Sequence, residues 1–425
     1  MRDAGPDAEP TPPLPYLVAI NLTQRCNLAC EHCYMDARQR GVAQEGELTT
    51  AETQELLDEI GGRAPGTIIV LTGGEPLMRP DLESLVAAGG RAGLRMVVGT
   101  NGLLLTEPRI RQLKGAGLEG VGISLDSVRA DLHDGFRGLP GAFEKTCRAF
   151  RLCGQQNLHA QLHCTVTRAN LSELEAMVAL GRELGATIVN FFFLVCVGRG
   201  QATIDLEPDR YEEALREIAH LQRRSKGIMV QTRCTPHFKR ILYEADPASP
   251  YTRATGYDGG GCLAATRYCR VDPLGEVTPC PYMELSAGNV RDRSFWRIWD
   301  EAPLFHSLRE PVLEGRCGEC EFELLCGGCR ARSLVEAGNL LGEDPNCAYR
   351  PCGGPTIAVR DTAAAFAVPW TDEARDRLKR VPIFLRGRIE RKLEERATRD
   401  GVFVTVELMK QHREEREREL GIRFE

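Results

Sequence analysis

A chain of 425 residues is too long for one ordinary compact core, so two or three domains are expected. Hydrophobic residues make up 42% of the chain and charged residues 27%, a composition typical of soluble globular proteins. The formal net charge of −6 does not favour a general nucleic-acid-binding protein, so nucleic acid is not expected as a partner.

Neither the N-terminal residues nor the apolar runs indicate a membrane protein. Residues 1–15 are acidic and proline-rich, which predicts a disordered tail and not a signal peptide. The longest apolar run, residues 189–197 with one polar Asn190, is too short to cross a bilayer. We therefore expect a cytoplasmic protein without a membrane partner.

Residues 16–200 alternate short runs rich in β-branched residues with helical stretches. Strands are predicted over residues 18–22, 67–71, 95–99, 121–125, 160–166 and 187–194. Helices are predicted over residues 50–60, 81–92, 107–115, 141–153 and 171–184. Such alternation indicates βα units around a parallel sheet. Six units are too few for a closed eight-stranded barrel, so we predict an α/β fold with a partial (βα)6 barrel and its chemistry at the carboxyl ends of the strands.

The rest of the chain divides into three predicted parts. Residues 201–258 are expected to be a helical linker, with one helix over residues 208–224. Residues 259–352 are rich in cysteine, glycine and turns, which is typical of a small domain that metal centres hold together. Residues 361–425 are predicted to form a small helical domain, with a helix capped by Thr371 and apolar side chains recurring every four residues from Leu385.

The seventeen cysteines are unusual for a protein in a reducing compartment, where metal binding is the first alternative to disulfides. Three of them lie between Cys26 and Cys33, and nine lie between Cys262 and Cys352. The five others are expected to be small buried hydrophobic residues. These are Cys147, Cys153, Cys164, Cys196 and Cys234.

Cys26, Cys30 and Cys33 stand directly after the first predicted strand. Three thiolates can hold a cubane iron–sulfur cluster by three of its irons and leave the fourth iron open to another ligand. Cysteine triplets also contribute to zinc sites, and the spacing alone leaves both possibilities open.

The triplet resembles the motif C-x3-C-x-aromatic-C of the radical S-adenosylmethionine (SAM) family, with His32 at the aromatic position and Tyr34 just beyond. The sequence after the second strand resembles the family's glycine-rich segment, which binds the methionine amino group. That segment consists of Gly73, Gly74, Glu75 and Pro76. Glycines let the backbone approach a ligand closely, and Glu75 can accept from an ammonium. The resemblance implies a 4Fe–4S cluster on the triplet, bound S-adenosylmethionine, and its cleavage to a 5′-deoxyadenosyl radical that abstracts hydrogen from a substrate.

Later strand ends resemble the family less specifically. Asn101 follows the third strand, and Ser124 and Asp126 close the fourth. By resemblance these residues line the ribose and carboxylate of S-adenosylmethionine, and turn formation is an equally suitable role. In the fifth strand His163 shares a face with Thr165, where a core histidine is expected. The sequence identifies no catalytic acid or base.

The cysteine-rich part resembles the SPASM extension of the radical SAM family, which carries one or two auxiliary 4Fe–4S clusters. By resemblance, one cluster is held by Cys317, Cys320, Cys326 and Cys347. The other is held by Cys262, Cys269, Cys280 and Cys329. The sequence departs from the common form where two residues instead of three separate Cys326 from Cys329, and paired C-x2-C units also suit zinc.

The C-terminal residues around Trp370 and Phe384 resemble the small C-terminal domain of light-independent protochlorophyllide reductase. The resemblance implies contact with a tetrapyrrole, for which these aromatic side chains and the basic Arg386 and Arg388 are suitable. Packing or dimerisation is the alternative. The cysteine-rich part also resembles radical SAM enzymes of haem and haem d1 biosynthesis, around Tyr282.

Together these features predict a radical SAM oxidoreductase that modifies tetrapyrrole side chains in haem-type cofactor biosynthesis. A reducing protein such as flavodoxin or ferredoxin is the expected electron donor. Two alternatives remain at this point: a SPASM-type maturase that modifies a peptide or protein, and a non-catalytic zinc or redox-sensing protein.

Overall fold

The computed structural model describes residues 12–39, 44–200, 204–247 and 261–357. In the C-terminal part it describes residues 370–381, 386, 389–390, 392–394, 396–397 and 404–420. Most of the predicted tail therefore lies outside the described residues, as do Leu385, Phe384 and Arg388. Within the described ranges, no helix combines the length and the hydropathy that crossing a membrane requires.

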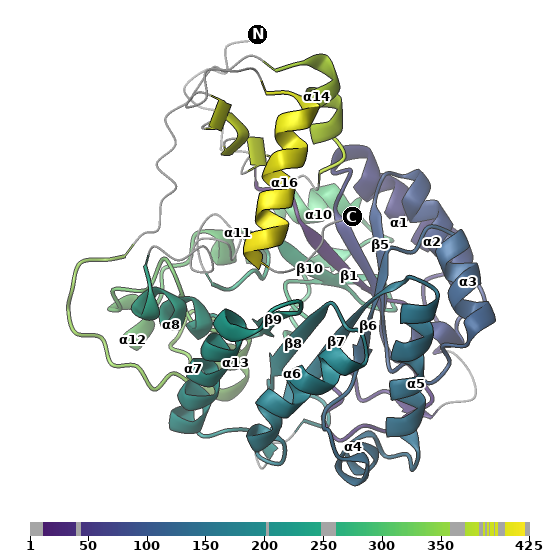
Figure 1. The fold of residues 1–425 in the computed structure, drawn as a ribbon. Coiled ribbons are helices and arrows are strands. Elements are labelled where there is room, and N and C mark those ends of the chain that lie inside the picture. The colour runs from purple at the N-terminus through teal and green to yellow at the C-terminus, as the bar shows by residue number, and fades with distance from the viewer. Residues whose placement is uncertain are drawn as a thin grey trace.

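A curved, mostly parallel sheet of ten strands forms the centre of the molecule (Figure 1). Its strand order is β12-β11-β10-β1-β4-β5-β6-β7-β8-β9, so β12 and β9 are the edge strands. The six predicted strands are confirmed as β1 (Leu17–Asn21), β4 (Ile68–Thr72), β5 (Arg95–Thr100), β6 (Gly120–Ser124), β7 (His159–Val166) and β8 (Ile188–Phe193). All neighbours among these six pair in parallel, which confirms the partial barrel.

Four strands extend this sheet beyond the prediction. Strand β9 (Met229–Arg233) lies within the expected helical linker and pairs in parallel with β8. On the other side, β10 (Tyr268–Val271) pairs in parallel with β1, and the antiparallel strands β11 (Glu276–Thr278) and β12 (Gly288–Asn289) follow it. The cysteine-rich part is therefore built directly onto the barrel sheet beside its first strand.

Helices cover the outer face of the sheet, as Figure 1 shows for α1, α2, α3, α5 and α6. The helices of the barrel part are α1 (Thr50–Arg63), α2 (Leu82–Arg91), α3 (Glu107–Gly115), α4 (Ala130–Arg137), α5 (Ala142–Gln155), α6 (Leu174–Glu183), α7 (Pro208–Arg224) and α8 (His237–Ala245). Helix α1 begins at a capping box in which Thr49 and Glu52 exchange hydrogen bonds. Helix α4, which the sequence did not predict, ends at Gly138 in the left-handed conformation.

Strand alternation separates a dry outer face from a polar inner face. The outward side chains of β1 and β7, such as Ile20 and Leu162, are fully buried in one large apolar core beneath the helices. The inward side chains of the later strands include His163 and Phe192, which lie beside each other with ring centroids 5.0 Å apart. His163 therefore lies on the inner face of the barrel and not in the apolar core.

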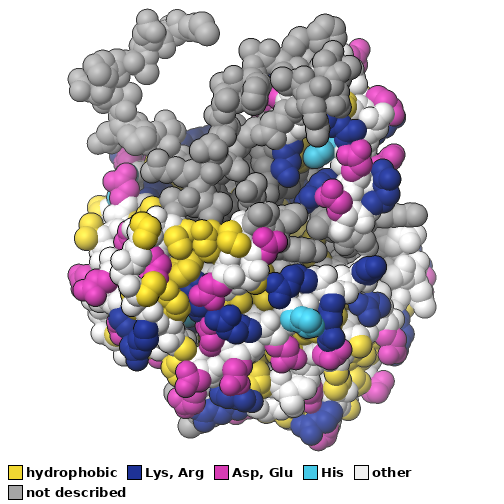
Figure 2. Space-filling view, turned by 60° about the vertical axis from the view of Figure 1, so that its left-hand side comes forward, with side chains coloured by type: hydrophobic (Ala, Val, Ile, Leu, Met, Phe, Trp, Pro, Cys, Tyr) yellow, Lys and Arg dark blue, Asp and Glu magenta, His cyan; other side chains and the backbone are white. Residues whose placement is uncertain are grey.

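The remaining helices belong to the cysteine-rich and C-terminal parts. They are α10 (Phe295–Glu301), α11 (Pro303–Arg309), α12 (Gly315–Gly318), α13 (Arg330–Ala337), α14 (Asp372–Leu378) and α16 (Val406–Leu420). The C-terminal part has its own small core of Leu393, Ala397, Val404 and Leu408, against which Trp370 packs. Basic and acidic side chains are interspersed over the surface that Figure 2 shows, consistent with the small net charge.

Candidate iron–sulfur and S-adenosylmethionine sites

The predicted triplet lies on a tightly held loop at the carboxyl end of β1. Cys26 lies in the short strand β2 (Arg25–Cys26), which pairs with β3 (Arg38–Gln39). Arg199 holds the rest of the loop: its guanidinium donates hydrogen bonds to the carbonyl of Cys30 at 2.9 Å and to the carbonyl of Ala37 at 2.7 Å. Contacts within the protein therefore hold this loop in place.

The three thiols of this loop face donors that stabilise a thiolate. Burial raises the pKa of Cys26 to about 12, and it also raises the pKa of Cys30. Arg137 opposes this effect at Cys30, because its Nη1 lies 3.6 Å from Cys30 Sγ. The Ala37 amide donates to Cys33 Sγ at 3.3 Å. Because a bound metal deprotonates its thiol ligands, close-set sulfurs with donors aimed at them suit an iron–sulfur cluster.

The two glycines after β4 are required by the cysteine loop. A Cβ at Gly73 would lie 2.6 Å from the Thr23 carbonyl oxygen, and one at Gly74 would lie 2.1 Å from the Arg25 carbonyl oxygen. The Gly74 amide donates to the Thr23 carbonyl at 2.7 Å, and the next amide donates to the Arg25 carbonyl at 2.7 Å. The glycine-rich turn therefore packs against the backbone that carries Cys26.

Glu75 joins the ends of two strands within this site. It is fully buried and accepts hydrogen bonds from Thr100 Oγ1 at 2.7 Å, the Asn101 amide at 2.9 Å and the Leu77 amide at 3.1 Å. Burial raises its pKa. A cationic group placed beside it would favour the carboxylate. Pro76 then begins a single 3-10 turn, Pro76–Met78, that turns the chain away.

Asp126 is held by protein groups at the end of β6. Its Oδ2 accepts from Arg137 Nε at 2.6 Å, and its Oδ1 accepts from the Thr165 amide at 3.0 Å. Burial acts to raise the pKa of Asp126, but the Arg137 guanidinium outweighs it and lowers the pKa. Arg137 thus links this carboxylate to Cys30. Ser124 lies in register with His163 on the inner face.

The aromatic positions of the loop have separate contacts. The His32 ring stacks on Phe136 with centroids 4.4 Å apart. The Tyr34 hydroxyl lies 3.4 Å from Asn21 Oδ1, and its ring packs edge-on against Tyr282 with centroids 5.5 Å apart. Tyr34 therefore connects the cysteine loop to the cysteine-rich part.

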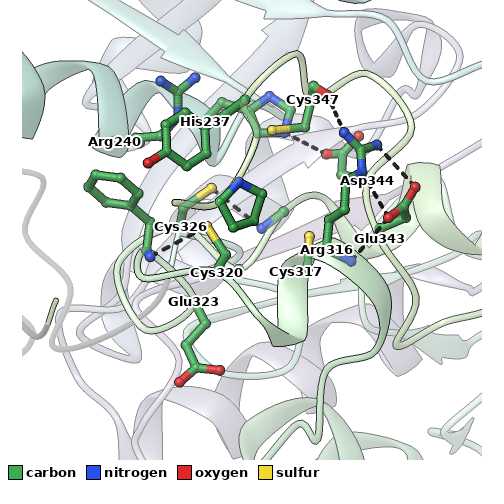
Figure 3. Close-up of a pocket in the computed structure, with 15 residues that line it drawn as sticks. His237, Arg240, Arg316, Cys317, Cys320, Glu323, Cys326, Glu343, Asp344 and Cys347 are labelled. Atoms are coloured by element: carbon green, nitrogen blue, oxygen red, sulfur yellow. Dashed lines mark hydrogen bonds and ion pairs between the residues drawn. The ribbon is translucent and has the colours of Figure 1, made fainter. Parts of the chain in front are cut away.

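Four of the predicted auxiliary ligands surround one pocket, which Figure 3 shows. They are Cys317, Cys320, Cys326 and Cys347. The Phe322 and Gly328 amides lie 3.5 Å from the sulfurs of Cys320 and Cys326. This pocket therefore presents a complete set of four thiols to one centre.

A buried ionic group lies beside this pocket. Asp344 is completely buried and pairs with Arg332 at 3.0 Å and with His237 Nε2 at 3.0 Å. Burial acts to lower the pKa of His237, but Asp344 outweighs it and raises the pKa to about 9. His237 in turn lowers the pKa of Cys347. The charge pattern therefore favours a thiolate at Cys347.

The other predicted auxiliary set is only partly brought together. Cys262, Cys280 and Cys329 belong to one small cluster of buried and half-buried side chains. Cys269 is fully buried in the large apolar core beneath the sheet instead. Cys234, which the sequence suggested was a buried bystander, lies with the three.

In the C-terminal part, the predicted tetrapyrrole contacts have partners of their own. Trp370 Nε1 donates to Glu394 Oε1 at 2.8 Å. Arg386 Nε donates to the Val381 carbonyl at 2.9 Å. These contacts agree with the packing alternative.

Three family profiles match the chain in the order of its parts. The radical SAM superfamily matches residues 20–181, an iron–sulfur cluster-binding domain (SPASM) matches residues 262–321, and the proto-chlorophyllide reductase 57 kD subunit matches residues 370–413. An "AdoMet-dependent heme synthase" of Methanosarcina barkeri is 39% identical over 347 residues, which are 79% of this chain and 97% of that protein. The chain belongs to the radical SAM family.

Other relatives of this radical SAM protein carry different names. A "Pre-heme d1 synthase" of Dinoroseobacter shibae is 31% identical over 362 residues, covering 80% of this chain and 89% of the relative. A "Mycofactocin maturase MftC" of Mycobacterium tuberculosis is 31% identical over 345 residues, covering 78% and 83%. The protein is an iron–sulfur enzyme that uses S-adenosylmethionine, so a non-catalytic zinc or redox-sensing protein is not retained as an alternative.

Solved structures agree on the fold of the radical SAM chain. SuiB of Streptococcus suis bound to S-adenosylmethionine has a TM-score of 0.64 at 16% identity, covering 79% of this chain and 78% of that one. The enzyme anSMEcpe with bound AdoMet has a TM-score of 0.62 at 20% identity, covering 78% and 94%. At these identities the likeness concerns the fold alone.

Sequence reasoning missed the residues that hold the ligand loops in place. Arg137 lies on the unpredicted helix α4, and Arg199 lies after β8, far from the triplet in sequence. No sequence motif marks either arginine, because each meets its partner only when the chain is folded. Gly73 and Gly74 were predicted from the motif, and their close contact with the cysteine loop appears only in the structure.

We predict that Gly74→Ala weakens the cluster on the triplet. Its new Cβ collides with the Arg25 carbonyl, and overpacking of this kind costs about 1–3 kcal/mol. Iron bound after anaerobic reconstitution and cleavage of S-adenosylmethionine should both fall. Gly62→Ala in α1 is the matched control, because nothing lies within 4 Å of its new Cβ. Unchanged iron in Gly74→Ala would contradict the packing role.

We also predict that Arg137→Leu destabilises the fold and the cluster loop together. The change leaves the buried Asp126 carboxylate without its cation, which typically costs about 3–5 kcal/mol. The double variant with Asp126→Asn should recover part of the loss in the thermal unfolding midpoint. The exposed Arg148→Leu on α5 serves as control. Equal midpoints for Arg137→Leu and Arg148→Leu would show that the buried pair is not important.

Proposed function

We propose that the protein modifies the side chains of a tetrapyrrole in the biosynthesis of a haem-type cofactor. The similarity to the Methanosarcina heme synthase carries this proposal, because it extends over 97% of that relative. The pre-heme d1 synthase relative supports the same substrate class. We expect loss of a carboxylate from a propionate side chain as one example of the reaction.

The inner face of the barrel has side chains suited to such a substrate. In β9, Arg233 donates to Gln231 Oε1 at 2.7 Å and to the Thr232 carbonyl at 3.2 Å, both neutral acceptors. In β10, Arg270 has a buried Nε without a hydrogen-bond partner among the described residues. Phe192 lies in register with Arg233. Basic groups beside an aromatic surface suit a flat ring that carries carboxylates.

The proposed ligands follow the grouping of the thiols. Cys26, Cys30 and Cys33 would hold the cluster that binds S-adenosylmethionine, with Tyr34, the glycine-rich segment, Asn101, Ser124 and Asp126 around it. Cys317, Cys320, Cys326 and Cys347 would hold an auxiliary cluster. When bound, the first cluster and S-adenosylmethionine supply a carbon radical that abstracts hydrogen from an unactivated C–H bond.

The protein's own residues orient the reactants. The loop clasped by Arg199 keeps the triplet at the carboxyl ends of the strands, and the inner face opens toward it. Burial lowers the pKa of His163 to about 3, so the imidazole is neutral at physiological pH and donates or accepts without charge. We assign it a positioning role toward substrate.

The remaining parts of the account are also proposals. We keep the division into a tail (1–15), a barrel (16–200), a linker (201–258), an auxiliary domain (259–352) and a C-terminal domain (361–425). A flavodoxin or ferredoxin is the proposed reductant, and the cytoplasm the proposed location.

The substrate class is tested with a panel. Reconstituted protein is incubated under reducing conditions with sirohaem-derived and coproporphyrin-type tetrapyrroles, and products are read by mass spectrometry. Turnover of a tetrapyrrole is the expected result. Turnover of a peptide and of no tetrapyrrole would favour the maturase alternative, which the mycofactocin maturase relative keeps open.

Arg233→Ala should raise the KM for a carboxylate-bearing tetrapyrrole about tenfold or more, because a hydrogen bond to a charged group contributes about 1.5–3 kcal/mol. The KM for S-adenosylmethionine should stay unchanged. Arg224→Ala, at the exposed end of α7, is the control. A tetrapyrrole KM equal to that of the control would exclude Arg233 from substrate binding.

Replacing Cys317 and Cys320 by alanine should stop product formation while S-adenosylmethionine is still cleaved. Cleavage depends on the triplet, whereas an oxidised product must pass an electron onward, for which an auxiliary cluster is suited. Both reactions are measured by chromatography of 5′-deoxyadenosine and of product. Equal loss of both in a folded variant would argue against the electron-transfer role.

A further inference from the structure

Cys234 occupies an unusual position in the chain. It lies directly after the carboxyl end of the edge strand β9 and shortly before α8. Its φ of 61° lies in the left-handed region, which residues other than glycine and asparagine rarely adopt. A backbone of this kind persists only where the surrounding structure holds it in place.

Three contacts connect Cys234 to the segments that carry Cys262, Cys280 and Cys329. Arg332, three residues after Cys329, donates from Nη1 to the Cys234 carbonyl at 3.0 Å. The hydroxyl of Tyr282, two residues after Cys280, hydrogen-bonds the Cys234 thiol.

The third contact reaches the segment of Cys262. A Cβ at Gly261 would lie 2.6 Å from Cβ of Pro236, so the chain just before Cys262 packs on the turn that follows Cys234. Independent contacts from three segments therefore meet at the turn that carries Cys234, and one of them reaches its thiol.

The four thiols lie near one another. Cys262, Cys280 and Cys329 pack in one small cluster of side chains. Cys234 interacts electrostatically with Cys280 and with Cys262 of that cluster. A shared metal centre needs thiols gathered in this way.

Cys269 cannot join this group, because of the pleat of β10. Side chains alternate between the two faces of a strand. Tyr268 points to the inner face, where it lies near Cys280 and Cys234. Its neighbour Cys269 points to the opposite face and is fully buried in the apolar core, in register with Val18.

We propose that Cys234, and not Cys269, is the fourth protein ligand of the auxiliary 4Fe–4S cluster held by Cys262, Cys280 and Cys329. This inference rests on the proposed function, because it requires an iron–sulfur cluster at these cysteines. Four thiolates occupy every iron of a cubane, so this cluster has no open iron for substrate and serves electron transfer. The barrel strand β9 thereby supplies a ligand to the auxiliary domain.

The test counts irons in a chain that lacks the triplet, so that only auxiliary clusters remain. The background is the full chain with Cys26, Cys30 and Cys33 replaced by alanine, reconstituted without oxygen, with about eight irons expected from two clusters. Cys234→Ala and Cys269→Ala are each added to it. After mild oxidation, Cys234→Ala should lose about one iron and show the electron paramagnetic resonance signal of a 3Fe–4S cluster. Cys269→Ala should match the background.

A loss of iron in Cys269→Ala alone, or in neither variant, overturns the proposal. If Cys234→Ala does not fold, Cys234→Ser decides, because serine can still ligate: shifted resonances of the reduced cluster support the proposal, and a spectrum identical to the background overturns it. No substrate is present, so failure of the tetrapyrrole proposal leaves this result unaffected.

Discussion

The parallel pairing of β1 with both β4 and β10 is the constraint on which the arrangement of the sites depends. Carboxyl ends of parallel strands meet at one edge of a sheet, so the cysteine loop after β1 and the glycine turn after β4 are forced together. The same pairing brings β10, and with it the cysteine-rich part, beside the same loop. Tyr34 and Tyr282 make contact across this junction.

Local sequence was sufficient for much of the barrel. Each of the six strands is marked by its own short run of β-branched residues. The cysteine triplet is likewise a short motif, directly after the first strand. The four cysteines of the set around Cys317 line one pocket, and their ligand role stays a prediction. Family membership followed from the same motifs.

The errors and omissions arise where distant segments meet. Strand β9 was not predicted because Met-Val-Gln-Thr-Arg is short and mostly polar, and only pairing with β8 makes it a strand. The grouping of Cys269 with Cys262 came from the resemblance to the SPASM extension, whereas strand alternation directs the Cys269 side chain to the other face of the sheet. Arg137 and Asp344 were also missed, because each acts through a buried ion pair that no sequence motif marks.

The two auxiliary groups are also coupled to each other through Asp344. Its carboxylate accepts from the Cys329 amide at 2.7 Å, its carbonyl accepts from the Cys347 amide at 3.2 Å, and it pairs with Arg332 and His237. One buried residue therefore contacts the backbone of one proposed ligand from each group.

The central claim is that the triplet holds a cluster with one iron open to S-adenosylmethionine. The most direct measurement is the electron paramagnetic resonance spectrum of dithionite-reduced, anaerobically reconstituted protein, recorded before and after S-adenosylmethionine is added. The account predicts a reduced 4Fe–4S signal that changes on addition, and no such change when the three cysteines are alanine. A spectrum that does not respond to S-adenosylmethionine in the intact chain would contradict it.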